Sequence, residues 1–369
     1  MIVSKFKSLL FQGTQFAVTY RRARLCWHGR VAYDEPKVYY GRDHIPGKDE
    51  NACGGIIKAQ DLQSVYPNRK DQPNILYLIS SALPAYAATM VRQAKKHGAR
   101  VVLNQNGTAY PAWHGPGWEK TNRPMRKVLE LADYVFYQSQ FCKTAADLHL
   151  LERNDDFEIL HNPVDCSTFV PSRYKTPGHR LISAGTHNQL YRVQCAIETA
   201  VILKRSIPDI QLTFAGRYHW RNSHAESMEE LEALVESSGI AGSITVLGPY
   251  SQNEVVPLMQ EHHVALHTKY NDPCPRLVTE ALACGLPVVY SDSGGVPELV
   301  GRDAGIGVPA PLDWQDLHAP APDQLAEAVV RVFEKYDAFS AAARRRSIEH
   351  LDVGPWLERH KQIFSEIIQ

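Results

Sequence analysis

Residues 271–301, NDPCPRLVTEALACGLPVVYSDSGGVPELVG, contain a loop, a helix, a buried strand and a second, glycine-bearing loop in succession. Pro275 fits the first turn of a helix, where no backbone N–H partner is lost, while Gly285 and Pro287 fit its end. The run 288–290 is short and apolar, as expected of a buried strand. Apolar helix, tight turn and buried strand in this order are typical of a doubly wound α/β domain.

The start of this predicted helix has the features of a phosphate-binding site. The N–H groups of Arg276, Leu277 and Val278 lie at the positive end of the helix dipole. Asp272 precedes the helix and Glu280 lies one turn inside it, so both carboxylates can accept hydrogen bonds from hydroxyl groups near a bound anion. A phosphate with hydroxyl groups beside it is the chemistry of a nucleotide sugar.

The same residues carry a family resemblance. The segment resembles the signature of the retaining glycosyltransferases of family 4 (glycosyl transferases group 1), which have the GT-B fold. In that signature two acidic residues eight positions apart precede Ala-x-Ala-x-Gly-x-Pro-Val and Gly-Gly-x-Pro-Glu. The matching residues are Asp272, Glu280, Ala281, Ala283, Gly285, Pro287, Val288, Gly294, Gly295, Pro297 and Glu298. Asp272 replaces the usual Glu, and Pro273-Cys274-Pro275 replaces Gly-Phe-Gly, which removes two N–H donors.

The resemblance implies an α/β fold of the GT-B class, with two Rossmann-like, doubly wound domains that face each other across a cleft. The alternation of apolar strands and helical stretches from about Lys37 agrees with it. We predict an acceptor-binding domain at residues 1–172, a nucleotide-sugar-binding domain at 173–353 and a helix at 354–369 that returns to the first domain. Residues 171–178, polar and proline-bearing, are the predicted hinge.

Two predicted sites precede the second domain's signature. Gly54 and Gly55 come before a helix, where a glycine backbone can approach a ligand closely, and Lys58 can point the same way. The resemblance implies that such a glycine pair lies near the donor phosphates and the acceptor, so Gly54, Gly55 and Lys58 are predicted donor-binding residues. A glycine pair before a helix is also commonly a simple turn. Asn106 stands where many family members have His; its amide can donate to a sugar hydroxyl but cannot transfer a proton.

The resemblance also implies two cationic side chains that neutralise the departing diphosphate. Gly185 and Thr186 occupy the family's Gly-Arg pair, so the Arg is missing, and Arg192 stands for a Lys that follows it. We predict that Arg192 clamps the diphosphate and that Arg276 supplies the missing second cation. Loops at strand ends, which hold the nucleotide base in the resembled fold, contribute the donor-binding residues Gly216, Arg217 and Tyr250. The predicted catalytic residues are Asp272, Glu280, Arg192 and Asn106.

Composition narrows the class of protein. The 369 residues have zero formal net charge, so no overall field favours nucleic acid. Seven scattered cysteines without metal-ligand spacing indicate reduced thiols and a cytoplasmic protein. His262, His263 and His267 also lack zinc spacing and are interpreted as structural. With no metal motif in the sequence, we expect neither a metal nor another cofactor beyond the nucleotide sugar itself.

The first 33 residues are basic: Lys5, Lys7, Arg21, Arg22, Arg24 and Arg30 all precede the first acidic residue, Asp34. With apolar residues between them, this segment could lie on an anionic membrane, which would place the protein at its inner face. The alternative is a basic strand–helix element packed on its own domain. Irregular spacing of the apolar residues favours this second interpretation.

The sequence therefore predicts a metal-independent, retaining glycosyltransferase that moves a sugar from a nucleotide sugar to a hydroxyl of a glycan, lipid-linked or small-molecule acceptor. Three alternatives remain open. A nucleotide-sugar epimerase would need several carboxylates or histidines around the sugar, and a phosphorylase would need a cofactor lysine. The altered family positions also allow a non-catalytic protein that binds a sugar nucleotide or a glycan.

Overall fold

The protein was analysed as a computed structural model that describes residues 2–47, 50, 54–174 and 177–369. It forms two compact units. Unit 1 comprises Met1–Leu160 and Gly354–Gln369, and unit 2 comprises His161–Val353. Residues 161–172, which the sequence analysis placed in the first domain, are therefore grouped with the second. Residues 175–176 of the predicted hinge lie outside the described residues.

Unit 1 is built on a parallel sheet whose strands lie in the order of the sequence. The strands are β1 (Val38–Tyr39), β2 (Ile75–Ile79), β3 (Arg100–Gln105), β4 (Tyr134–Tyr137) and β5 (Phe157–Ile159). The helices are α1 (Ile2–Cys26), α2 (Ile56–Leu62), α3 (Ala87–Lys96), α4 (Pro111–His114), α5 (Trp118–Leu131), α6 (Gln140–His149) and α14 (Val353–Ile367), with a 3₁₀ turn η1 at Ser80–Ala82. All five residues of β2 are buried, because helices cover both faces of the sheet.

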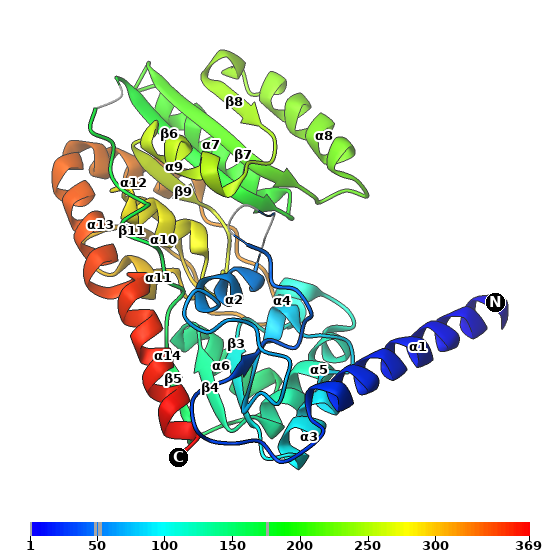
Figure 1. Ribbon diagram of the computed structural model, residues 1–369. Helices are drawn as coiled ribbons and strands as arrows, with labels where there is room; N and C mark the ends of the chain where they lie inside the picture. Colours follow the sequence, from blue (N-terminus) through cyan, green and yellow to red (C-terminus); the bar gives the residue numbers. More distant parts are fainter. Residues whose placement is uncertain (1, 48–49, 51–53, 175–176) are drawn as a thin grey trace. The chain divides into compact units, whose positions relative to one another are not determined.

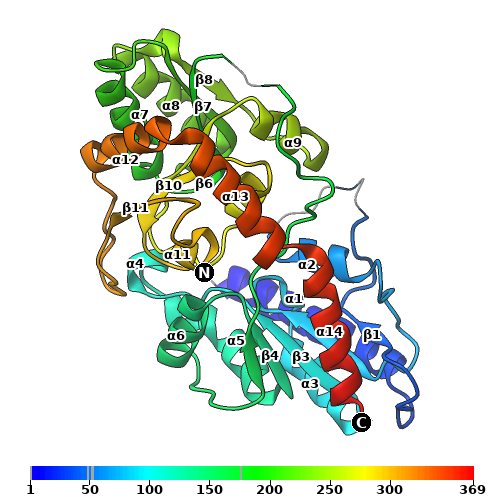
Figure 2. The ribbon, with the colours of Figure 1, turned by 90° about the vertical axis from the view of Figure 1, so that its left-hand side faces the viewer.

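Each face of the unit 1 sheet has its own core. On one face, side chains from the end of α1 and from α3, α5 and α6 pack on the sheet. On the other, Ala59 and Leu62 of α2 pack together with Trp356, Ile363 and Phe364 of α14. Figures 1 and 2 both show α14 running beside this sheet. The last helix of the chain thus completes a core whose strands come from its first half.

Unit 2 is a six-stranded parallel sheet with the order β11-β10-β9-β6-β7-β8. Its strands are β6 (His179–His187), β7 (Ile210–Tyr218), β8 (Ile244–Leu247), β9 (Val264–His267), β10 (Val288–Asp292) and β11 (Gly305–Pro309). Its helices are α7 (Tyr191–Lys204), α8 (His224–Ser237), α9 (Gln252–Gln260), α10 (Arg276–Ala283), α11 (Val296–Val300), α12 (Pro322–Glu334) and α13 (Tyr336–His350), with a 3₁₀ turn η2 at Ala241–Ser243. Strand order reverses between β6 and β9, which makes this unit doubly wound. Ligands of such sheets bind at the carboxyl ends of the strands beside the reversal.

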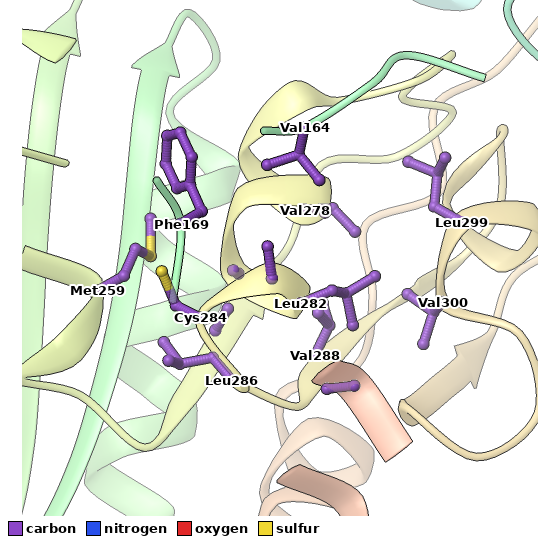
Figure 3. Close-up of a cluster of buried hydrophobic side chains, with 14 of the residues drawn as sticks. Val164, Phe169, Met259, Val278, Leu282, Cys284, Leu286, Val288, Leu299 and Val300 are labelled. Atoms are coloured by element: carbon purple, nitrogen blue, oxygen red, sulfur yellow. The ribbon is translucent and has the colours of Figure 1, made fainter. Parts of the chain in front are cut away.

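Helix α10 is anchored by its apolar side. Val278 and Leu282 are fully buried, and Figure 3 shows the α10 segment with Phe169 and Met259 to one side and Leu299 to the other. The helix ends as the sequence predicted, since Gly285 adopts a φ of +76° just after it. This packing fixes the first turn of α10 relative to β9 and β10.

The basic N-terminal segment is one helix, α1, and not a strand followed by a helix. Its last turns pack on unit 1: Ala23 is buried, the Thr19 hydroxyl donates to the Ala85 carbonyl at 2.9 Å, and Arg22 pairs with Asp43. This part of the segment therefore packs on its own domain, and contact of the segment with a membrane stays a prediction. The beginning of α1 extends away from the sheet (Figure 1). Among the described residues, no helix combines the length and apolarity that crossing a bilayer requires.

We predict that Phe364→Ala destabilises unit 1 by about 3–5 kcal/mol, because it leaves a cavity beneath α14. Ile348→Ala is the matched control, because Ile348 on α13 is 50% exposed and its truncation should cost no more than about 0.5 kcal/mol. Urea unfolding of both variants measures the difference. Equal stabilities would show that α14 does not complete the unit 1 core.

Candidate functional site

The predicted donor residues of unit 2 gather where the strand order reverses. Gly185 and Thr186 lie near the carboxyl end of β6, and Arg192 lies in the first turn of α7, the helix that follows this strand. Asp272 lies in the loop between β9 and α10. Because parallel strands end at one edge of the sheet, residues up to 87 positions apart in the sequence meet there.

The backbone of Asp272 is held by the glycine pair of the signature. The Gly295 N–H donates to the Asp272 carbonyl at 2.8 Å, and the Asn271 N–H donates to the Ser293 hydroxyl at 2.8 Å. Gly294 has a φ of +68°, and a Cβ there would lie 2.3 Å from the Asp272 carbonyl oxygen. Only glycine permits this approach, so the Gly-Gly motif serves to place the carboxylate.

Two cations and a histidine converge on the Asp272 carboxylate. Its Oδ2 lies 3.1 Å from Lys269 Nζ and 3.2 Å from His267 Nε2, and Arg192 is close enough to act on it electrostatically. Burial alone would raise the pKa of Asp272, but these neighbours outweigh it and hold the pKa well below its usual range. Burial lowers the pKa of His267, so this ring is neutral near pH 7. Asp272 is an ionised, buried carboxylate.

Sequence reasoning missed two members of this group. His267 was interpreted as structural and Lys269 was not considered. Lys269 has no regular spacing from Asp272 to reveal it, because the segment between them is a loop. The position of His267, at the carboxyl end of a strand beside the reversal, was the available signal.

Arg192 reaches the predicted site but is covered there. The side chain is 3% exposed, its Nη1 donates to the Thr186 carbonyl at 2.5 Å, and its Nε has no hydrogen-bond partner among the described residues. Burial lowers its pKa, although a guanidinium stays protonated. A diphosphate could contact this group only if the residues covering it moved. Its charge already acts on Asp272.

At the start of α10 the groups predicted to bind the donor pair with one another. Arg276 Nε lies 3.1 Å from Glu280 Oε1, and the Val278 N–H donates to the Pro275 carbonyl at 3.1 Å. Tyr250 is close enough to Glu280 for the carboxylate to add to the raised pKa of its phenol, which is caused chiefly by burial. Across the cluster, the cations Arg192, Lys269 and Arg276 outnumber the carboxylates Asp272 and Glu280, which favours an anionic ligand.

The remaining donor-binding predictions of unit 2 lie on β6 and β7. Gly185 and Gly216 are register partners, and a Cβ on Gly216 would lie 1.9 Å from the Gly185 carbonyl oxygen. A Cβ on Gly185 would be 3.9 Å from Leu277 Cδ2, so this pair borders α10. Thr186 and Arg217 are the next partners along these strands and are both exposed. Of the two, only Thr186 lies directly beside Arg192.

Unit 1 contains a second polar cluster, at the carboxyl ends of β2 and β3. Lys58 is buried there and donates to Asn104 Oδ1 at 2.5 Å and to Asn106 Oδ1 at 2.8 Å. The Asn106 amide nitrogen in turn donates to the Ser81 hydroxyl at 2.6 Å. A Cβ on Gly55 would meet that hydroxyl oxygen at 2.4 Å, whereas one on Gly54 would meet nothing within 4 Å. The predicted residues Gly55, Lys58 and Asn106 therefore form one cluster. Asn104, which was not among the predicted residues, belongs to the same cluster.

The described part of the chain holds no group of three or more His, Cys, Asp or Glu residues arranged to bind a metal ion. Six cysteines are described; all are buried and none forms a disulfide. Metal independence stays a prediction.

A comparison with protein families classifies the second unit. The family described as "Glycosyl transferases group 1" matches residues 172–346. These residues form a glycosyl transferases group 1 domain. The match spans Asp272, Glu280, Arg192 and the glycine pair Gly294–Gly295 that holds the Asp272 backbone, here called the glycine clasp, so these residues of the predicted donor site lie inside this group 1 domain.

Curated relatives agree with this assignment. The chain is 26% identical over 208 residues to a protein of Mycolicibacterium gilvum named D-inositol 3-phosphate glycosyltransferase, covering 54% of this chain and 43% of the relative. A protein of the same name from Mycolicibacterium vanbaalenii is 24% identical over 304 residues, with 75% and 65% covered. The chain thus spans about half the length of the curated relatives it matches.

Solved structures show the fold. The Anabaena protein HepE, solved with UDP and glucose, is 17% identical with a TM-score of 0.64, and the match covers 80% of this chain and 78% of HepE. Sucrose-phosphate synthase of Thermosynechococcus elongatus is 16% identical with a TM-score of 0.62, covering 85% and 76%. The group 1 domain and unit 1 together have the GT-B fold, which confirms the predicted fold class.

The lowered pKa of Asp272 predicts how the stability of the protein depends on pH. Because the folded pKa lies below the ordinary value of 3.8, the carboxylate contributes stability that is fully present above pH 3.8 and is lost as the pH falls toward the folded pKa. Asp272→Asn should therefore unfold more easily than the wild type at pH 7, by about 1–3 kcal/mol, with a smaller difference near pH 3. Urea unfolding at several pH values measures this, with the exposed Asp303→Asn as control. If the difference in free energy of unfolding between the wild type and Asp272→Asn did not narrow at low pH, the stabilising role of the ionised Asp272 would be contradicted.

Proposed function

We propose that the protein transfers a sugar from a nucleotide-sugar donor to a hydroxyl group of an acceptor, with retention at the anomeric carbon and without a metal. One observation carries this proposal. A buried, ionised Asp272 lies at the strand reversal of a group 1 domain, with Arg192 and Lys269 beside it and its backbone clasped by Gly295.

The carboxylates and cations of the site divide the donor between them. Glu280, in the first turns of α10, binds the ribose hydroxyls, and Asp272 binds hydroxyls of the donor sugar, since ionised carboxylates are strong acceptors. The amide groups at the start of α10 hold the diphosphate, and Arg192 joins them once the residues that cover it move. Lys269 adds a cation beside Asp272.

Transfer breaks the bond between the anomeric carbon and the diphosphate oxygen and forms a bond from that carbon to the acceptor oxygen. The acceptor's proton passes to the departing phosphate oxygen on the same face of the sugar. Cations beside the diphosphate stabilise the negative charge that develops as the first bond breaks. The site residues therefore act through charge and position, and no side chain forms a covalent bond.

Unit 1 is the proposed acceptor-binding unit, through the cluster of Gly55, Lys58 and Asn106. A neutral asparagine at this position can orient a hydroxyl but cannot accept its proton, which agrees with proton transfer to the leaving group. D-inositol 3-phosphate, in the name of the relatives, is the first acceptor to test. A glycan or lipid-linked acceptor is the next class, the latter at the inner face of a membrane.

A second function is favoured by one feature of the site. Arg192 is covered and bonded to the Thr186 carbonyl, in a site that also lacks the family's Arg and Gly-Phe-Gly. These features suit a protein that binds a sugar nucleotide without turning it over. Release of free nucleotide in the presence of an acceptor separates the two functions.

We predict that one sugar nucleotide from a panel of UDP-, GDP-, ADP- and CMP-sugars stabilises the protein in a thermal-shift assay without divalent metal. At a donor concentration a hundredfold above Kd the gain is about 2.7 kcal/mol, or roughly 5–10 °C. The double variant Asp272→Asn/Glu280→Gln should lose this shift, whereas Asp303→Asn should keep it. If every sugar nucleotide leaves Tm unchanged, the proposed donor site is wrong.

Arg192 provides a sharper test of the cation requirement. We predict that Arg192→Met weakens donor binding by about tenfold or more, because a charge-assisted interaction with the diphosphate is lost. Arg192→Lys retains the charge and should bind within a few-fold of the wild type. Arg205→Met, at the exposed far end of the same helix, is the matched control. Calorimetric titration gives each Kd, and an unchanged Kd in Arg192→Met would rule out the proposed role.

A further inference from the structure

A buried histidine of the last helix begins a chain of polar contacts in unit 1. His360 on α14 is fully buried, and its Nδ1 lies 2.9 Å from the Trp356 carbonyl oxygen. A carbonyl only accepts, so Nδ1 carries the proton. Burial lowers the pKa of His360 to about 3, so the ring is neutral near pH 7 and its Nε2 is an acceptor. The Tyr77 hydroxyl, 3.1 Å away, must therefore donate to Nε2.

The chain continues from Tyr77 to the cluster at the end of the sheet. Lys58 is an ammonium and can only donate, so the two carbonyl oxygens that face it are Asn104 Oδ1 and Asn106 Oδ1. This orientation turns the Asn104 amide nitrogen away from Lys58. Asn104 lies on the same face of the sheet as Tyr77, because its register partner on β2 is Ile79, two residues beyond Tyr77. Burial raises the pKa of the Tyr77 phenol, and the neighbouring Asn104 side chain lowers it. The Asn104 amide nitrogen itself has no hydrogen-bond partner among the described residues.

The hydrogen bonds on the two sides of the Asn104–Tyr77 contact run in one direction. Lys58 donates to Asn104, Asn104 lies beside Tyr77 on the sheet, Tyr77 donates to His360, and His360 donates to the backbone of α14. Lys58 is 3% exposed and the other three side chains are fully buried. Burying polar groups is costly unless they are hydrogen-bonded, so the bonds of Lys58, Tyr77 and His360 restrict each of them to one orientation.

The chain joins two places that the fold otherwise keeps apart. Its Lys58 end lies at the carboxyl edge of the sheet, beside Gly55 and Asn106. Its His360 end is packed in the core, where the ring stacks on Phe136 with centroids 4.3 Å apart. The carbonyl oxygens of two neutral amides, Asn104 and Asn106, fix the position of the Lys58 ammonium.

We propose that Tyr77 and His360 are positioning residues, which orient the Asn104 amide and through it the Lys58 ammonium and the Asn106 side chain at the acceptor-binding edge of unit 1. Their role in transfer rests on the proposed function. Neither residue touches substrate. The last helix of the chain thereby helps to shape a site formed by residues from the first third of the sequence.

The first experiment tests the chain itself, without any substrate. In the ¹⁵N-histidine-labelled protein, the signals of His360 are identified by their loss in His360→Gln. We expect the neutral tautomer with the proton on Nδ1, and a pKa that rises by about half a unit or more in Lys58→Met. The titratable or charged groups that face the ring are Tyr77 from β2, Lys58 from α2 and Arg359 from its own helix.

Lys96→Met removes an exposed lysine of the same unit and should leave the His360 pKa unchanged. A proton on Nε2, or an equal His360 pKa in Lys58→Met and Lys96→Met, would overturn the proposed chain.

The second experiment measures the positioning role in transfer. Nucleoside diphosphate release is followed with the donor that stabilises the protein, with D-inositol 3-phosphate as acceptor and with water alone. Tyr77→Phe and His360→Phe keep their aromatic packing but break the chain, so kcat should fall about tenfold while the KM for the donor stays within twofold. His360→Gln can still accept from Tyr77 and donate to Trp356, and should restore most of kcat.

These measurements separate a positioning role of the chain from a purely structural one. A loss in His360→Gln equal to that in His360→Phe, or a kcat that falls only in step with Tm, would mean that the chain is structural and does not position Lys58. If no sugar nucleotide binds to the wild type, the proposed function fails and the role in transfer fails with it. The tautomer and the coupling to Lys58 are then still decided by the first experiment.

Discussion

The burial of one ionised carboxylate, Asp272, constrains most of the second unit. A buried charge is tolerated only with partners, and Lys269 and Arg192 provide them from two different segments. The carboxylate also has to be held in place, which explains why Gly294 takes a left-handed conformation and approaches the Asp272 backbone so closely. The reversal of strand order brings these segments to one edge. The glycines of the family signature hold the backbone of this carboxylate, whereas the cations beside it lie outside the signature.

Unit 1 solves a similar problem with different chemistry. It buries a lysine, and the acceptors that hold Lys58 include two neutral amides at the edge of the sheet. In unit 2 the cations Arg192, Lys269 and Arg276 lie with the two carboxylates Asp272 and Glu280. Each unit thus places cationic side chains at the carboxyl ends of its strands. A donor diphosphate and an anionic or hydroxyl-bearing acceptor have the complementary chemistry.

Sequence reasoning succeeded where local rules decide the structure. The end of α10 at Gly285 and the strand after it follow from turn chemistry and apolar runs, and the GT-B fold is what the resemblance of the signature to its family implies. It does not give the surroundings that folding creates. Arg192, the predicted diphosphate clamp, is buried and donates to the Thr186 carbonyl, and its role in donor binding stays a prediction. His267 and Lys269 carry no pattern of their own, because their importance arises only from proximity to Asp272.

The sequence by itself determined the fold class, the glycine clasp and the two carboxylates, since each depends on residues close together in the chain. The tertiary structure alone decided which charges face one another and which polar groups are buried together. Asn104, Tyr77 and His360 illustrate the difference: they lie on β3, β2 and α14, and Tyr77 and His360 are 283 positions apart. No periodicity or spacing can connect such residues, because their contact is created by the last helix packing on a sheet formed by the first half of the chain.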